Sequence, residues 1–356
     1  MRTLLVALAL GGVLVASQGG LAGSVRSLPA PDAVVRTPQA VPLLAADGRR
    51  VAFTTTQRFG HDVEYRVDVW SAGAGSPVVV ARDRHSEEAF AVGIDGLALA
   101  GVHLAWTTWA QGNGREQSVV VARVGGKAQV LDELFANSDG GDRGGDYVGG
   151  LHGGGSLIVA NTWTQCDTID YQTGETNTSC RPGSPDWISA AALVEIEGVK
   201  LRPLHTAPDA MRVADVDRGR IVVPEDAGPV SVRNARGALL RRLPFPKGAV
   251  LGAQATGPLV VVLKQDGLWT ESGSCPLAPA PGRVLAGAGQ GAAVLVEQRR
   301  ALRVIRLADC RELRLAPTTG TIGSADLTDA GLFYARNGSG GSVAFVSAAS
   351  LRRGFD

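Results

Sequence analysis

Seven short runs rich in β-branched and apolar residues recur along the chain, each between a turn bearing Gly, Asp or Ser and a polar loop. Their spacing is close to the roughly 40–50 residues of a propeller blade. Such a repeat constrains the fold more than any single motif, because one unit cannot bury its apolar face without its neighbours. The runs cover residues 51–55, 104–108, 157–161, 220–223, 259–263, 293–296 and 332–335.

Further strands accompany the runs and make units of four short strands. A second alternating strand follows each run, as at residues 65–70, a third follows a turn, as at residues 78–81, and another precedes the run, as at residues 89–94. Period-2 alternation without long helical periodicity predicts an all-β array. We predict a seven-bladed β-propeller over residues 33–352, in which residues 33–37 supply the strand that completes the last blade and closes the ring.

The first unit carries a resemblance to a known family. Residues 46–53 read Ala-Asp-Gly-Arg-Arg-Val-Ala-Phe, and residues 67–70 read Val-Asp-Val-Trp. This pattern resembles the repeat of TolB-like secreted bacterial β-propellers. The resemblance implies a propeller over nearly the whole mature chain and a role in binding other proteins. Related architectures host lyases, lactonases and quinone-dependent dehydrogenases, so the fold alone does not assign a chemistry.

The charge balance narrows the class of partner. The chain has 356 residues, of which 45% are hydrophobic, enough for a large core. The 35 Lys and Arg residues nearly balance the 34 Asp and Glu residues, for a net charge of +1. This balance argues against nucleic acid or an anionic membrane surface as the main partner. We expect a monomer that binds a protein or glycan partner.

The N-terminal segment has the pattern of an export signal. A positive start at Met1 and Arg2 precedes an apolar run at residues 4–16, and small residues follow it. This pattern predicts a secretory signal peptide over residues 1–22, with a linker over residues 23–32. A membrane anchor is the alternative, but glycines dilute the run below the length that spans a bilayer. We therefore predict a secreted or extracytoplasmic protein whose mature chain is not inserted in a membrane.

The four cysteines agree with an oxidising compartment. An even number of cysteines in an exported chain favours disulfides, and no C-x-x-C spacing points to zinc or a redox centre. By proximity in the sequence we predict the pairs Cys166–Cys180 and Cys275–Cys310. The second pair would join the outer turns of blades five and six, so it requires blade five to lean toward its neighbour.

Long connections are concentrated in the first three units. The connections between second and third strands are expected to be long at residues 57–64, 109–117 and 162–189, whereas units four to six turn tightly. The links at residues 82–88 and 132–150 fall on the same face. Long irregular loops in a compact domain are usually functional or disordered, so we predict that this face of blades 1–3 binds the partner.

Aromatic and acidic residues of the long connections are the candidate contacts. The segment 162–189 could present rigid aromatic anchors beside a disulfide, or its aromatic side chains could instead cover a blade edge. The predicted binding residues are Trp163, Asp167, Asp170, Tyr171 and Trp187. Asp139, Asp142 and Asp146 could supply oxygen ligands to Ca²⁺, although a solvated turn also explains them. No other cofactor is expected.

Two function hypotheses remain open at this point. The first is an exported, non-catalytic binding scaffold. The second is an enzyme of the lactonase or lyase type with a metal near the central channel. His61 and His85 could then form a pair at the rim, while the recurring acids of the inner strands could line the channel or cap turns. These acids are Asp95, Asp215, Asp217 and Asp326. The sequence contains no nucleophile elbow, H-E-x-x-H or P-loop motif.

Overall fold

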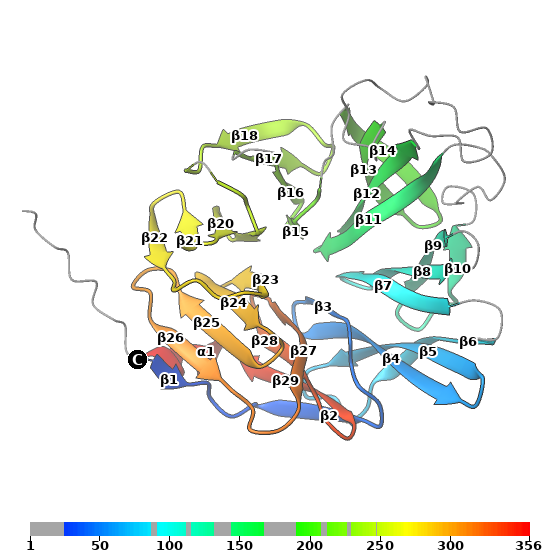
Figure 1. Cartoon of the computed structure of the whole chain (residues 1–356), viewed down its shortest axis with the longest axis horizontal. Coiled ribbons are helices and arrows are strands. Elements are labelled where there is room, and N and C mark those ends of the chain that lie inside the picture. The colour runs from blue at the N-terminus through cyan, green and yellow to red at the C-terminus, as the bar shows by residue number, and fades with distance from the viewer. Residues whose placement is uncertain are drawn as a thin grey trace, which may run out of the picture.

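Seven antiparallel sheets surround a central axis in the computed structural model (Figure 1). Each sheet has four strands in chain order from the axis outward, apart from two sheets that take strands from the N-terminal segment. The fold is therefore an all-β, seven-bladed propeller, as the repeat predicted. The structure describes residues 25–86, 91–111, 115–131, 144–166, 190–207, 212–225, 229–246 and 248–356.

Blades 1–3 contain the twelve strands that follow the N-terminal pair of strands. Blade 1 consists of β3 (Leu44–Asp47), β4 (Arg50–Phe59), β5 (Asp62–Ser71) and β6 (Val78–Ser86). Blade 2 consists of β7 (Ala91–Ala100), β8 (His103–Gln111), β9 (Arg115–Arg123) and β10 (Gln129–Leu131). Blade 3 consists of β11 (Gly144–Gly154), β12 (Leu157–Cys166), β13 (Ala190–Glu197) and β14 (Lys200–Ala207).

Blades 4–7 are built from shorter strands. Blade 4 consists of β15 (Asp215–Asp217), β16 (Arg220–Pro224), β17 (Val230–Asn234) and β18 (Leu239–Leu243). Blade 5 consists of β19 (Gly252–Thr256), β20 (Leu259–Lys264), β21 (Gly267–Thr270) and β22 (Gly273–Pro276). Blade 6 contains β23 (Arg283–Gly289), β24 (Ala292–Glu297), β25 (Ala301–Arg306) and β26 (Glu312–Leu315). Blade 7 contains β27 (Thr321–Leu327), β28 (Gly331–Asn337) and β29 (Gly341–Ser347).

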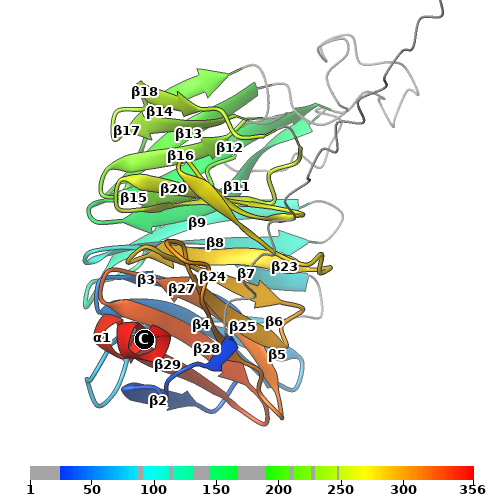
Figure 2. The ribbon, with the colours of Figure 1, turned by 90° about the vertical axis from the view of Figure 1, so that its left-hand side faces the viewer.

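The N-terminal segment closes the ring. β2 (Ala33–Thr37) pairs antiparallel with β29 and becomes the fourth strand of blade 7, which confirms the predicted closure. β1 (Val25–Ser27), within the segment expected to be a linker, pairs parallel with β26 as a fifth strand of blade 6. α1 (Ala348–Phe355) follows β29 and buries Leu351 and Phe355 against the core (Figure 2).

Blades 1–3 differ from blades 4–7 in the length of their strands. The second and third strands have 8–10 residues in blades 1–3 and 4–7 residues in blades 4–7. The prediction of a long loop at residues 57–64 is wrong, because β4 and β5 continue as strands up to a tight turn at Gly60 and His61. Residues 82–86 and 144–150 are likewise strand rather than connection. The ends of these strands carry many polar residues, so their sequence has the composition of a loop although the backbone continues as an extended hairpin.

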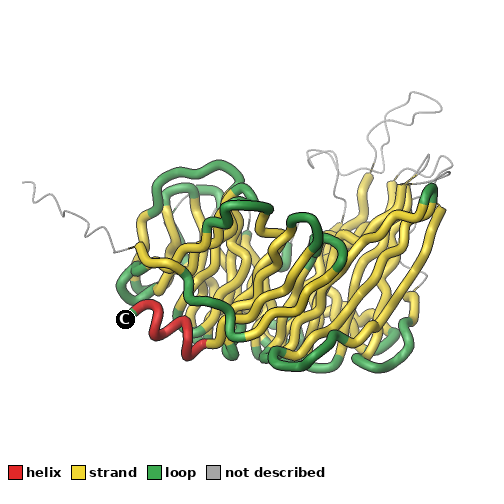
Figure 3. The backbone as a smooth tube through the Cα atoms, turned by 90° about the horizontal axis from the view of Figure 1, so that it is seen from below, coloured by secondary structure: helices red, strands yellow, loops and turns green. Residues whose placement is uncertain are grey.

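Two faces of the ring are distinguished by their turns. We call the face with the turns between second and third strands, such as β4–β5, the top face. The face with the β3–β4 and β5–β6 turns is the bottom face, where α1 lies (Figure 3). No helix in the described ranges is long and apolar enough to span a bilayer.

One of the two predicted disulfides is present. Cys275 of β22 and Cys310 of the β25–β26 turn are bonded, and their Cα atoms are 5.4 Å apart. The bond joins the outer parts of blades 5 and 6, which confirms that blade 5 approaches its neighbour. The pair Cys166–Cys180 lies outside the described residues, because Cys180 does.

Candidate functional site

Most of the predicted contact residues lie outside the described part of the chain. These residues are Asp139, Asp142, Asp167, Asp170, Tyr171 and Trp187. The backbone of the others is described: Asp146 in β11 is opposite Thr164, and Trp163 in β12 is opposite Tyr147. Asp146 and Trp163 are therefore on adjacent strands of blade 3. The calcium hypothesis stays a prediction. Within the described ranges no three His, Cys, Asp or Glu side chains gather to hold a metal.

An aromatic cleft lies between blades 1 and 2. It has a volume of about 320 Å³, and the aromatic side chains that line it are Tyr65, His85, Trp106 and Trp109. The Trp109 ring lies against Gly93 of the neighbouring strand, where an added Cβ would approach the indole Nε1 to 2.5 Å. A glycine at this position therefore allows the ring to lie flat on the inner strand of blade 2.

Polar groups surround the aromatic rings of this cleft. His85 Nε2 lies 2.9 Å from Asp83 Oδ2, and both side chains are largely exposed, at 40% and 65%. The Tyr65 hydroxyl donates a hydrogen bond to the Val92 carbonyl across the blade boundary. Tyr65 and His85 are ring neighbours, with centroids 6.3 Å apart. The cleft thus combines rigid ring faces with hydrogen-bonding groups, the usual composition of a binding site.

The suggested histidine pair stays a prediction. His61 occupies the exposed β4–β5 turn, whereas His85 is on β6 with Asp83 as its partner. Tyr65 and Trp109 are not among the binding residues predicted from the sequence. For Trp109 the available signal is the pair of tryptophans that flank Thr107 and Thr108 in one strand, with Gly93 on the paired strand. No local pattern marks Tyr65.

The inner strands of all seven blades line a central channel. Its larger cavity, of about 730 Å³, is lined by His152, Asp215, Gln254 and Asp326 among others. A second cavity of about 300 Å³ shares Asp215, Gln254 and Asp326 and continues toward the bottom face. Two of the four predicted channel acids therefore lie at the junction of these cavities. Asp217 lines the second cavity and is bound to Arg220 at 2.7 Å.

The channel acids join neighbouring blades. Asp326 of blade 7 accepts a 2.8 Å hydrogen bond from the Ala46 N–H of blade 1, and Asp215 of blade 4 accepts one of 2.7 Å from Ala255 of blade 5. Asp47 of blade 1 accepts one from the Gly101 N–H of blade 2. These bonds satisfy backbone groups of the next blade, so the acids have a structural role that accounts for their recurrence.

The fourth predicted channel acid belongs to a different bridge. Asp95 accepts a hydrogen bond from the Thr107 hydroxyl at 2.5 Å and another from the Gln117 amide at 3.1 Å. The Gln117 carbonyl oxygen in turn accepts a bond from the Val148 N–H of blade 3. Asp95 therefore connects blades 2 and 3 through a side-chain relay.

Burial changes the protonation of the channel residues. It raises the pKa of Asp326 to about 7 and that of Asp215 to about 7, and the nearby Asp326 adds to the rise at Asp215. Burial lowers the pKa of His152 to about 4. Near neutral pH the imidazole is therefore uncharged, while the two carboxyl groups are partly protonated.

The two channel acids predict a pH-dependent stability. Each has a folded-state pKa above its unfolded value of 3.8, so the folded state binds more protons between pH 4 and 7 and its stability falls as the pH rises through that window. One pKa unit corresponds to about 1.4 kcal/mol, so a rise from 3.8 to about 7 amounts to about 4 kcal/mol for a group that keeps the full shift. Because both carboxyl groups border the open channel, solvent screening reduces this amount, and we expect a total loss of at least about 2 kcal/mol. Urea unfolding from pH 4 to pH 8 should show it, and Asp215→Asn with Asp326→Asn should remove the slope.

Asp32 provides the control for this measurement. A hydrogen bond from the Ser347 N–H lowers its pKa, so its contribution is complete above pH 4. Asp32→Asn should shift the unfolding free energy by the same amount at pH 5 and pH 8. At each pH, the free energy of unfolding of the double Asn variant is subtracted from that of the wild type. A difference that stays constant or rises from pH 4 to pH 7 would contradict the prediction.

The fold defines the class of protein: a seven-bladed β-propeller. No family model matches the chain, and no curated protein matches it. The TolB-like resemblance therefore stays a prediction. The relation to other proteins is seen at the level of the solved structures.

Several solved structures align with most of the chain at low sequence identity. An acylaminoacyl peptidase of Pyrococcus horikoshii aligns with a TM-score of 0.49 and 12% identity over 85% of this chain, which spans 51% of the peptidase's length. The Cps50 (Swd1) β-propeller domain of Myceliophteria thermophila aligns with a TM-score of 0.49 and 12% identity, covering 89% of this chain and 99% of that domain. The Pan2 WD40 domain of Neurospora crassa aligns with a TM-score of 0.47 and 10% identity, covering 90% of this chain and 97% of that domain.

Proposed function

We propose that this chain is an exported, non-catalytic binding scaffold that captures a protein or glycan partner on the top face of blades 1–3. The observation that carries the proposal is the aromatic cleft between blades 1 and 2. Tyr and Trp side chains dominate binding energy where they are rigid and partly buried. Trp109 meets both conditions because its ring rests on Gly93.

The lengthened strands of blades 1–3 support the same location. Their second and third strands are longer than those of blades 4–7, and in blade 3 they flank the segment that contains the predicted anchors Tyr171 and Trp187. The cleft opens between two of these long blades. Export is supported by the Cys275–Cys310 bond, since disulfides persist in oxidising compartments.

Substitution of Trp109 tests this function. We expect Trp109→Ala to weaken partner binding at least about tenfold, because truncation of an aromatic anchor removes a large rigid contact. Candidate partners would come from a glycan array and from pull-down of extracytoplasmic proteins, and affinity would then be measured by calorimetry. Tyr171→Ala and Trp187→Ala are expected to weaken the same binding.

Trp269→Ala is the matched control. Trp269 is a partly buried tryptophan on blade 5, far around the ring, whose Nε1 donates to Asp266. Its loss should change affinity less than about twofold, as for a surface change away from an interface. Equal losses in Trp109→Ala and Trp269→Ala, or a Trp109→Ala protein that is destabilised but still binds normally, would refute the proposed surface.

The alternative function is a lactonase- or lyase-type enzyme with a metal near the channel. The observation in its favour is the pair of channel carboxyl groups with a pKa of about 7, since perturbed acids cluster at functional sites. Against it, an oxygen of each accepts a backbone hydrogen bond from the next blade. Metal analysis of the purified protein distinguishes the two functions, and a stoichiometric, tightly held metal would favour the enzyme.

A further inference from the structure

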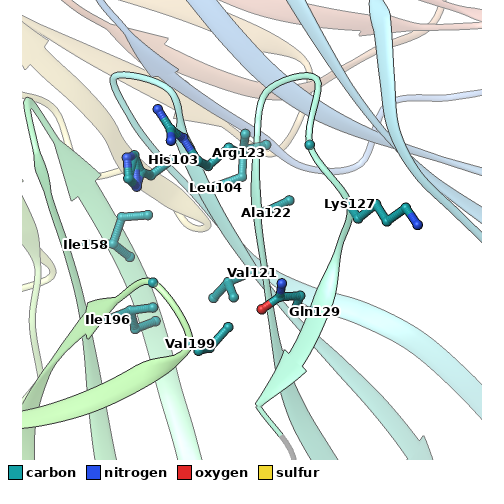
Figure 4. Close-up of a pocket in the computed structure, with 12 residues that line it drawn as sticks. His103, Leu104, Val121, Ala122, Arg123, Lys127, Gln129, Ile158, Ile196 and Val199 are labelled. Atoms are coloured by element: carbon teal, nitrogen blue, oxygen red, sulfur yellow. The ribbon is translucent and has the colours of Figure 1, made fainter.

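A second pocket lies on the bottom face, between blades 2 and 3, away from the top-face site (Figure 4). Its volume is about 300 Å³, at the lower end of the range of small-ligand sites. It lies beside the β9–β10 turn of blade 2 and the β13–β14 turn of blade 3. An added Cβ at Gly198 of the latter turn would meet no atom within 4 Å, so no other part of the described chain covers this turn.

The inner wall of this pocket is aliphatic. Val121, Ile158 and Ile196 belong to the core between blades 2 and 3 and are only 7%, 3% and 8% exposed. Val199 continues this wall at the tip of the β13–β14 turn, where it is 50% exposed. In Figure 4 these four side chains surround one open space. An alkyl chain would cover the exposed face of Val199, and the Gln129 amide borders the same space (Figure 4).

The Lys and Arg side chains that line this pocket give it a positive charge. Arg123 and Lys127 both line the pocket and are exposed, and neither has an ion-pair partner among the described residues. Arg123 lies beside His103 at one end of the space, whereas the Lys127 side chain extends away from the aliphatic wall (Figure 4). No Asp or Glu is among the described residues that line it. An anionic group at this end would therefore meet a guanidinium that has no competing carboxylate.

We propose that this pocket binds a medium-chain alkyl carboxylate. The chain lies against Val121, Ile158, Ile196 and Val199, and the carboxylate accepts hydrogen bonds from Arg123. The guanidinium suits this role because its planar donors match a carboxylate in bidentate geometry. The site is separate from the top-face cleft, so it stands or falls independently of the proposed function.

Calorimetry with sodium hexanoate, octanoate and decanoate, each below its micellar concentration, tests the inference. Each fully buried methylene strengthens binding about fourfold, so affinity should rise roughly fifteenfold for every two methylenes until the cavity is full. Decyltrimethylammonium, which has a decyl chain and the opposite charge, should bind at least tenfold more weakly than decanoate. Comparable binding of the two ions, or affinity that does not depend on chain length, overturns the proposal.

Two variants at Val199 locate the site. Val199→Asp and Val199→Lys both change an exposed turn position, so neither should disturb folding. They differ in the sign of the new charge, and the lysine stem keeps methylene groups in place of the valine. We expect Val199→Asp to weaken decanoate binding at least tenfold and Val199→Lys to retain it within about threefold. Arg123→Gln should also weaken it at least fivefold. An unchanged affinity in Val199→Asp and Arg123→Gln shows that decanoate binds elsewhere and overturns the assignment.

Discussion

Removal of residues 1–37 is expected to lower the free energy of unfolding by about 5 kcal/mol, the largest effect that we predict. The deletion removes β2, whose five residues pair with β29, and it uncovers the edge that Val35 seals at 7% exposure. Each backbone hydrogen bond contributes about 1 kcal/mol net, and burial of a valine side chain adds roughly 2. Because domains are stable by only about 5–15 kcal/mol, the shortened protein should unfold at much lower urea concentration.

A shorter deletion separates ring closure from the general loss of an N-terminal segment. Removal of residues 1–30 deletes β1 but retains β2 and Asp32, which accepts bonds from Ser347 and Ser350. β1 is exposed along its whole length, so we expect this loss to cost about 1 kcal/mol. Equal urea midpoints for the two deletions would show that β2 does not hold the ring closed.

Phe333→Ala is expected to destabilise the protein by about 4 kcal/mol. Phe333 is fully buried where blades 7 and 1 meet, 4.7 Å from the Phe345 ring and edge-on to Trp70 at 6.4 Å, measured between centroids. Large-to-small changes in such a core lose the transfer free energy of the ring and leave a cavity. Urea unfolding followed by tryptophan fluorescence measures the loss, since Trp70 lies in the same cluster.

Phe59→Ala serves as the comparison for Phe333→Ala. Phe59 is 40% exposed at the end of β4, where the Arg84 guanidinium lies 4.9 Å from its ring centroid. Its truncation should cost less than about 1 kcal/mol, because it opens no internal cavity. A Phe333→Ala loss as small as that of Phe59→Ala would mean that the junction of blades 7 and 1 relaxes around the vacated space.

The repeat of apolar runs was sufficient to predict the propeller. All seven predicted runs lie in the second strand of a blade, as with residues 51–55 in β4 and residues 332–335 in β28. Successive side chains of a strand point to opposite faces of the sheet, and neighbouring blades bury both faces of the middle strands. The second strand of each blade is therefore a continuous apolar run, which the sequence shows directly. The missing strand of the last unit likewise predicted closure by residues 33–37, because an open ring leaves an unpaired edge.

The residues of the candidate sites could be predicted only in part from the sequence. The predicted acids Asp215 and Asp326 do line the channel, but their bonds to the next blade could not be read from the chain, because those partners are 40 and 280 residues away. The aromatic cleft was missed for the same reason. Tyr65 and Trp109 come together only when blades 1 and 2 pack side by side.

What the sequence determined by itself is the set of local and periodic features: seven units of short strands, the strand that closes the ring, and the neutral charge balance. These depend on near neighbours and on burial, which alternation records residue by residue. The tertiary structure alone decided which side chains share a cavity. The angle between adjacent blades sets whether Cys275 reaches Cys310, whether Tyr65 and Trp109 share a cleft, and whether aliphatic residues leave space beside Arg123. That angle results from packing over the whole ring, and no local pattern encodes it.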